Sequence, residues 1–158
     1  MGCIMAFNVD FLNSKKTKEL YNLIKTQYGA LLPKKYVFAI NNKGKIYAIN
    51  NNILEVDKNK YHIDRLGLYL GRFSHEGIRC SIEGSQLIGQ FASKGILNLE
   101  PDQRLDWVTG KDVDLEKSHE DRLVLVKYKE DFIGGGKVRS NKLLNAVSKS
   151  RRLRVVNE

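Results

Sequence analysis

Short runs of β-forming residues recur along most of the chain, and the turn residues between them limit the protein to a fold built largely on antiparallel strands. The clearest pair covers residues 36–40 and 45–49. Between these two runs, the segment 41–44 (Asn-Asn-Lys-Gly) tolerates positive φ, which predicts a β-hairpin. Further strands are expected at residues 53–56, 66–73, 78–82, 96–99, 123–128 and 132–139.

Three consecutive glycines at residues 134–136 precede a lysine and invite comparison with a phosphate-binding P-loop. That motif would need glycine at position 131 and Ser or Thr at position 138, where the chain has Asp131 and Val138. Glycine within a strand is typical of a bulge or of a close backbone approach. The segment is therefore interpreted as a bulged strand.

The two clearest helical patterns lie in the first part of the chain. Asn13 or Ser14 can cap a helix, because a side-chain oxygen can accept a hydrogen bond from an unpaired backbone N–H. Apolar residues then recur at helical spacing up to Gly29, which is a typical helix stop. Leu87, Ile88 and Phe91 predict a second, short helix that ends near Gly95.

Three segments of the second half give weaker patterns. Asp102 is expected to cap a brief turn that leads to Trp107. Residues 140–150 suit a loop or a short helix. Leu153 and residues 155–156 alternate loosely and are expected to close a sheet.

Strands with helices, followed by short strands alone, predict an α+β protein in two parts. Residues 1–94 are expected to form an α/β domain with an antiparallel sheet and helices. Residues 95–158 are expected to form a small β-barrel. A length of 158 residues suits one domain or two small ones.

A basic surplus narrows the kind of partner. The chain has 27 Lys and Arg against 18 Asp and Glu, a formal charge of +9, which favours a polyanion such as nucleic acid. The surplus is uneven, since residues 100–121 hold three basic and eight acidic side chains, whereas residues 134–158 hold seven and one. One surface is therefore expected to attract phosphate and another to repel it.

The sequence favours a soluble protein in the reducing cytoplasm. It has only two cysteines, Cys3 and Cys80, no apolar run long enough to span a bilayer, and no secretory signal. Met1 and Met5 are both possible starts. The His and Cys residues are too scattered to predict a metal site, no serine or cysteine lies in a nucleophile motif, and no cofactor or enzymatic activity is expected.

The densest basic cluster is the candidate phosphate-binding site. If residues 137–139 and 151–154 lie on neighbouring strands, their charges converge on one patch, where guanidinium groups can bind phosphate oxygens in pairs. Tyr128 and Phe132 can stack on bases, although core packing is the favoured interpretation for both. The predicted RNA-binding residues are Lys137, Arg139, Lys142, Lys149, Arg151, Arg152 and Arg154.

Four segments together match a known pattern. Residues 66–75 (LGLYLGRFSH), then residues 78–82 (IRCSI) and a helix, are similar to the "LG…hGKFT…hRhxhTALDYLA" pattern of the Nip-seven ribosome biogenesis factors. The hairpin at residues 36–49 and the strand pair at residues 123–139 also resemble segments of that family. The sequence departs from the pattern at residues 81–89 (SIEGSQLIG), which replace the TALDYLA helix, and in its glycine-rich segment.

The resemblance implies an N-terminal α/β domain followed by a PUA domain, a small β pseudo-barrel that binds RNA. It also implies a role in maturing large-subunit ribosomal RNA without catalysis, alongside other assembly factors. The short length favours the archaeal type, and a monomer is expected. The basic residues that such PUA domains present near the chain end correspond by position to Lys149, Arg151, Arg152 and Arg154.

Two alternatives remain open. Residues 133–145 (IGGGKVRSNKLLN) also resemble the C-terminal PUA-like module of RNA cytosine-C5 methyltransferases, so the chain is alternatively a free-standing accessory domain of such an enzyme. A protein-interaction module in ribosome assembly is the second alternative, with the acidic block 100–121 or the helix 83–91 as its contact surface.

Overall fold

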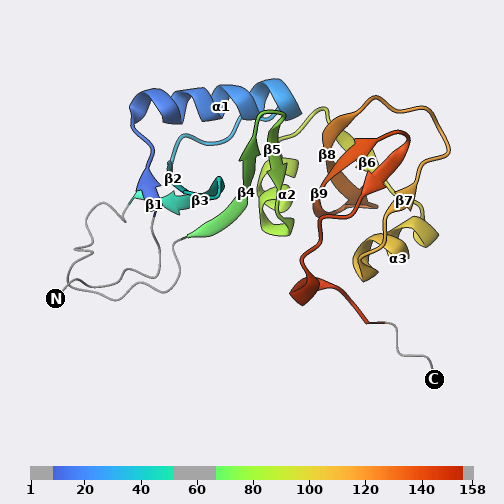
Figure 1. Cartoon of the computed structure of the whole chain (residues 1–158). Helices are drawn as coiled ribbons and strands as arrows, with labels where there is room; N and C mark the ends of the chain where they lie inside the picture. The colour runs from blue at the N-terminus through green and yellow to red at the C-terminus, as the bar shows by residue number, and fades with distance from the viewer. Residues whose placement is uncertain (1–8, 52–66, 155–158) are drawn as a thin grey trace.

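The computed structural model describes residues 9–51 and 67–154, and these residues form an α+β fold with two five-stranded sheets (Figure 1). The strand order is β1-β2-β3-β4-β5 in the first sheet and β6-β8-β9-β10-β7 in the second. The second sheet curls into a half-barrel. Because helices accompany the two sheets, the predicted α+β class is confirmed. The strand expected at residues 53–56 lies outside the described residues.

The first sheet is antiparallel throughout. In the predicted hairpin, Asn41 Oδ1 accepts hydrogen bonds from the backbone N–H groups of Lys43 and Lys45, both at 2.9 Å. The strands of this sheet are β1 (Val9–Phe11), β2 (Tyr36–Asn41), β3 (Lys45–Asn50), β4 (Leu68–Ser74) and β5 (Gly77–Cys80).

Helix α1 (Ser14–Tyr28) covers one face of the first sheet (Figure 1). Asn13 is the cap, since its side chain accepts a hydrogen bond from the Lys16 backbone N–H, and Gly29 ends the helix in the left-handed conformation at φ 64°. Buried Leu20, Ile24 and Tyr28 pack on the sheet in one hydrophobic core. Both predicted ends of this helix are confirmed.

Helix α2 (Ile82–Gly89) packs against both sheets, and it ends at Gly89 rather than near Gly95 as predicted. Ser81 caps it by accepting a hydrogen bond from the Gly84 backbone N–H, and this cap ends the preceding strand at Cys80 rather than at the predicted residue 82. Gly84 lies so close to β4 that an added Cβ would overlap the Leu70 carbonyl oxygen. The helix therefore sits flat on β4 while its other side contacts β9.

The second sheet packs around the buried indole of Trp107, which lies on α3 (Pro101–Thr109). β6 and β8 pair in parallel, and the other strand pairs are antiparallel. The glycine-rich strand β9 has a register shift opposite β8, which confirms the predicted bulged strand. The strands are β6 (Ile96–Asn98), β7 (Val113–Asp114), β8 (Arg122–Tyr128), β9 (Asp131–Arg139) and β10 (Lys142–Leu144).

The two sheets share packing at the joint between them. Buried Leu125 of β8 belongs to the same hydrophobic core as α1. An added Cβ at Gly135 of β9 would overlap the Cys80 carbonyl oxygen of β5, so the two strands approach at backbone distance. Residue 94 falls between α2 and β6, and the division into domains at 1–94 and 95–158 stays a prediction.

Two predictions for the second half are wrong, and a third is right in part. Residues 101–109 form a helix rather than a brief turn, and its cap is Glu100, not Asp102, with the Glu100 backbone N–H donating to Gln103 Oε1. Residues 140–150, expected to form a loop or a short helix, contain strand β10, then an irregular segment and the 3-10 helix η2 (Lys149–Arg151), so that prediction missed only the strand. Leu153 is not in a strand, and its backbone N–H donates to the Val108 carbonyl of α3. Residues 155–156, expected to belong to the same strand, lie outside the described residues.

Candidate nucleic-acid interface

The seven predicted basic residues are spread over several elements. Lys137 and Arg139 lie on β9, Lys142 lies on β10, and the other four lie on or just after η2. The neighbours of β9 are β8 and β10, and residues 151–154 form no strand, so the condition under which these charges would converge on one patch is not met. Convergence of all seven charges through strand pairing is therefore excluded.

Lys137 and Arg139 share one carboxylate of the first sheet. Lys137 Nζ lies 2.6 Å from Glu76 Oε2, and Arg139 Nη2 lies 3.7 Å from Glu76 Oε1. The hydrogen bond from Lys137 lowers the pKa of Glu76. These two basic side chains fasten β9 to the β4–β5 turn.

Lys142 faces the acidic block. Its Nζ lies 3.5 Å from Asp114 Oδ1 on β7, with which β10 pairs. Close by, the Ser140 backbone N–H donates to Asp121 Oδ1. Lys142 therefore lies among carboxylates rather than on a positive surface.

Arg151 forms an ion pair with Glu83 at the start of α2. Burial would raise the pKa of Glu83, but hydrogen bonds from the Arg151 guanidinium and from its own backbone hold that pKa below its usual range. The pair ties η2 to the first part of the chain. Half of the Arg151 side chain still faces solvent, which leaves it accessible to a ligand.

Arg152 is mainly structural, whereas Lys149 and Arg154 are exposed. Arg152 Nε donates to the Val147 carbonyl at 3.0 Å, and its side chain packs so closely on Gly110 that a Cβ there would overlap Arg152 Cδ. Within residues 9–51 and 67–154, no ion pair involves Lys149 or Arg154. These two and Arg151 form the η2 surface, the part of the predicted site that is best placed for phosphate.

Two exposed arginines that the sequence pattern did not single out, Arg72 and Arg79, stand directly opposite each other on β4 and β5. Lys45 on β3 stands opposite Arg72. The sequence could have predicted this pair of arginines, because the register of a tight hairpin determines which residues of its two strands stand opposite each other.

A small pocket of about 110 Å³ lies at the seam between the two sheets. The first part of the chain contributes Tyr69, Arg79 and Glu83 to its wall, and the second part contributes Trp107 and Arg151. The pocket therefore connects Arg79 of the first sheet with Arg151 of the η2 surface.

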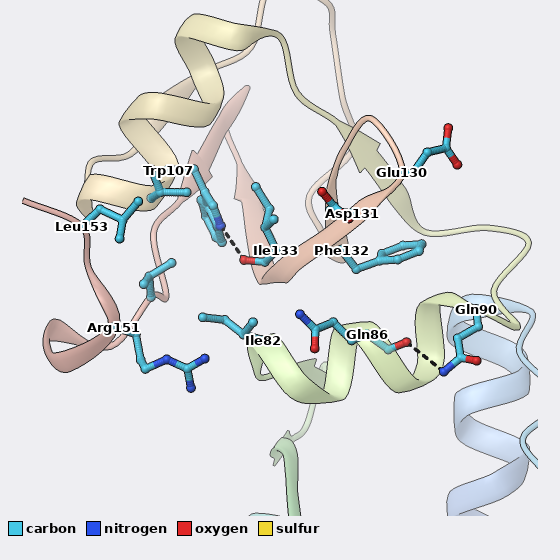
Figure 2. Close-up of a pocket in the computed structure, with 12 residues that line it drawn as sticks. Ile82, Gln86, Gln90, Trp107, Glu130, Asp131, Phe132, Ile133, Arg151 and Leu153 are labelled. Atoms are coloured by element: carbon cyan, nitrogen blue, oxygen red, sulfur yellow. Dashed lines mark hydrogen bonds between the residues drawn. The ribbon is translucent and has the colours of Figure 1, made fainter.

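A larger groove of about 500 Å³ runs along α2 on the other side of Arg151 (Figure 2). Gln86 and Gln90 line it from α2, and Phe132 lines it from β9. Its rim carries Glu130 and Asp131, so negative charge marks the end of the groove away from the η2 surface.

The two aromatic residues considered for base stacking have different surroundings. Phe132 packs against the first core and against Gly89 of α2, and Lys127 Nζ lies 5.2 Å from its ring centre. Tyr128 lies between Arg104 and Lys129, at 5.2 Å and 5.4 Å from its ring centre. Both rings are half-buried, in keeping with a packing role, and Phe132 alone of the two lines a groove.

Within the described ranges, no helix is long and apolar enough to cross a membrane. No group of three or more His, Cys, Asp or Glu side chains in that same part of the chain is placed to hold a metal ion.

Comparison with known families identifies the second half of the chain. Residues 94–153 match the family described as the PUA domain of the methyltransferase RsmF. No curated protein matches the chain. The protein therefore contains a PUA-type domain, built on the second sheet, and domains of this type generally bind RNA. All the predicted basic residues except Arg154 lie within the matched span.

Proposed function

We propose that the protein is a non-catalytic RNA-binding protein whose PUA-type domain holds structured RNA at the η2 surface. The observation that carries this proposal is that the PUA-type match ends in the most basic stretch of the sequence, where Lys149, Arg151 and Arg154 are exposed. Such cations supply affinity for phosphate and little choice among bases.

The proposal assigns the protein no chemical step. Its one described thiol, Cys80, is a poor nucleophile, because burial raises the pKa to about 12 and leaves little thiolate at neutral pH. The basic surfaces instead suit a role in which the protein positions RNA for another component.

We further propose that the bound RNA is ribosomal RNA. The match to a methyltransferase PUA domain supports action together with an RNA cytosine-C5 methyltransferase domain, on the same or another polypeptide. The resemblance of residues 36–49, 66–82 and 123–139 to the Nip-seven factors supports a role in large-subunit assembly. We place the methyltransferase association first, because the family match covers the candidate interface itself.

RNA binding is tested by removing Lys149 and Arg154 together, since neither has an ion pair within the described residues. The variant Lys149→Ala/Arg154→Ala should bind a structured ribosomal RNA fragment more weakly. Its plot of log affinity against log salt should be flatter by about 0.9 for each duplex phosphate that the variant no longer neutralises. The matched control is Lys15→Ala/Lys18→Ala, which removes the same charge from the exposed side of α1. Equal affinity and slope in the two variants would refute the assignment of the η2 surface.

The two finer assignments differ in the partner that remains after RNA is destroyed. Affinity purification after ribonuclease treatment should retain a methyltransferase if the first assignment is right. It should release large-subunit precursor particles if those are held through RNA. Loss of a C5-methylcytosine from ribosomal RNA on deletion, without accumulation of precursors, would also favour the methyltransferase association.

A further inference from the structure

Three basic residues form a row across the first sheet. Lys45 on β3 pairs with Arg72 on β4, and Arg72 pairs with Arg79 on β5. Paired residues on neighbouring strands stand about 5 Å apart on the same face. Buried Ile46 and Ile78, each one residue away along its strand, pack with α1. The row therefore lies on the face opposite α1.

The three positive charges of this row destabilise the first sheet when no ligand is bound. Like charges directly opposite one another on adjacent strands repel and destabilise a sheet. Strands β2, β3, β4 and β5 contain no Asp or Glu at all. In the described part of the chain, no ion pair involves Lys45, Arg72 or Arg79. An anionic ligand would remove the repulsion, so the row points to bound phosphate.

An aromatic pair lies next to the basic row on the same face. Tyr69 stands opposite Tyr47, with ring centres 5.6 Å apart, and Lys45 Nζ lies 5.5 Å from the Tyr69 ring centre. Arg72 and Arg79 also act electrostatically on the Tyr69 hydroxyl. Arg72 and Arg79 are exposed on this face, and Lys45 and Tyr69 are half-buried. Cations beside aromatic rings match the needs of single-stranded RNA, whose bases stack and whose phosphates are bound.

The basic row is continuous with the proposed PUA surface. Tyr69 and Arg79 line the seam pocket together with Arg151 and Ser148 of the second part. An RNA strand that passes from the η2 surface through this seam would meet Tyr69 and Arg79 in the pocket wall. Arg72 and then Lys45 continue the row across the sheet. The groove along α2, by contrast, carries Glu130 and Asp131 at its end away from Arg151, and these carboxylates disfavour phosphate there.

We propose that the face formed by Lys45, Tyr69, Arg72 and Arg79 binds a single-stranded segment that extends from the structured RNA held by the PUA-type domain. The proposal rests on the proposed RNA-binding function and adds the form of RNA that the protein prefers. Tyr69 stacks on a base, and the three cations bind the adjoining phosphates.

The test compares three RNAs: a hairpin, the same hairpin with a ten-nucleotide single-stranded extension at either end, and the extension alone. Binding of the full chain is measured by fluorescence anisotropy over a range of salt. The variants are Tyr69→Leu, Tyr69→Phe and Arg72→Ala/Arg79→Ala, with Lys15→Ala/Lys18→Ala as the matched charge control. Thermal melts confirm that each variant is folded.

The extension should strengthen binding to the parent protein about tenfold, as expected for one stacked base. Tyr69→Leu should remove that gain, and Tyr69→Phe should retain it because it keeps the ring. Arg72→Ala/Arg79→Ala should remove the gain and flatten the salt slope by about 1.4, for two single-strand phosphates. None of the three should change affinity for the bare hairpin.

The outcomes separate this proposal from the one it rests on. If the hairpin binds but the extension adds nothing, or if Tyr69→Leu keeps the gain, the single-strand site is refuted and the proposed function stands. Binding of the extension alone, without the hairpin, would support this face and refute the η2 surface. If no RNA binds, both proposals fail.

Discussion

The buried hydroxyl of Ser85 provides a measurable link between the two sheets. Ser85 is fully buried on α2, where its Oγ accepts a hydrogen bond from the Gly134 backbone N–H of β9 and donates one to the Ile82 carbonyl. Ser85→Ala leaves the Gly134 N–H buried without a partner, which costs about 1–3 kcal/mol. The higher helix propensity of Ala returns about 0.5 kcal/mol. We expect a net loss of about 1–2 kcal/mol in the free energy of unfolding.

For a chain of this size, that loss corresponds to a decrease of about 2–8 °C in Tm. Far-UV circular dichroism reports on the whole chain, and the fluorescence of Trp107, the only tryptophan, reports on the second sheet. Because the sheets share a core at Leu125, both signals should change in one transition and shift together. Ser148→Ala, at an exposed position, is the control and should stay within about 0.5 kcal/mol of the parent. A Tm for Ser85→Ala equal to that of the parent, or separate transitions for the two signals, would refute this account of the joint.

Three more predictions concern charge, reactivity and packing. The pKa of Glu83 is lowered in the folded protein, so its pair with Arg151 adds stability above the ordinary carboxyl pKa and loses it as the pH falls through the folded-state value. Glu83→Gln should therefore show a smaller drop in Tm than the parent on acidification, and an equal drop would contradict this. Cys80 should resist alkylation by iodoacetamide at pH about 8 until the protein unfolds, because burial raises its pKa to about 12. Mass spectrometry of a Cys3→Ser variant measures this alkylation. Gly135→Ala should lower the free energy of unfolding by about 1–3 kcal/mol in chemical denaturation, since the new methyl group would meet the Cys80 backbone, and a neutral result would show that β9 moves freely there.

Local signals in the sequence predicted the first sheet well. The Asn13 cap and the Gly29 stop give the ends of α1, and the Asn41–Gly44 turn gives the β2–β3 hairpin. The glycines at 134–136 predicted a bulge or a close approach, and the structure shows both, since β9 has a register shift and Gly135 lies against Cys80. These features depend on a few adjacent residues, so periodicity and turn chemistry suffice to predict them.

The errors fall where distant residues decide the conformation. Helix α3 buries one side chain, Trp107, so it lacks the apolar repeat that marks a helix. Strand β10 has three residues and exists because it pairs with β7 and β9 on either side. The alternation around Leu153 predicted a strand, but the segment passes beside α3 and hydrogen-bonds to Val108 instead.

The basic surface of the candidate site was also mispredicted because distant residues decide it. A basic cluster in the sequence predicted a basic surface, yet the structure pairs Lys137 and Arg139 with Glu76, which lies 61 residues before Lys137. The charge of a sequence segment includes its own Lys and Arg side chains but omits the carboxylates that folding brings next to them from distant segments. Arg72 and Arg79 stand in a stretch of modest charge, but cross-strand pairing places them side by side without a described carboxylate partner. Phosphate binding depends on the positive charge that is not neutralised by carboxylates in the folded protein. By this measure the basic row of the first sheet is as good a candidate for phosphate binding as the η2 surface.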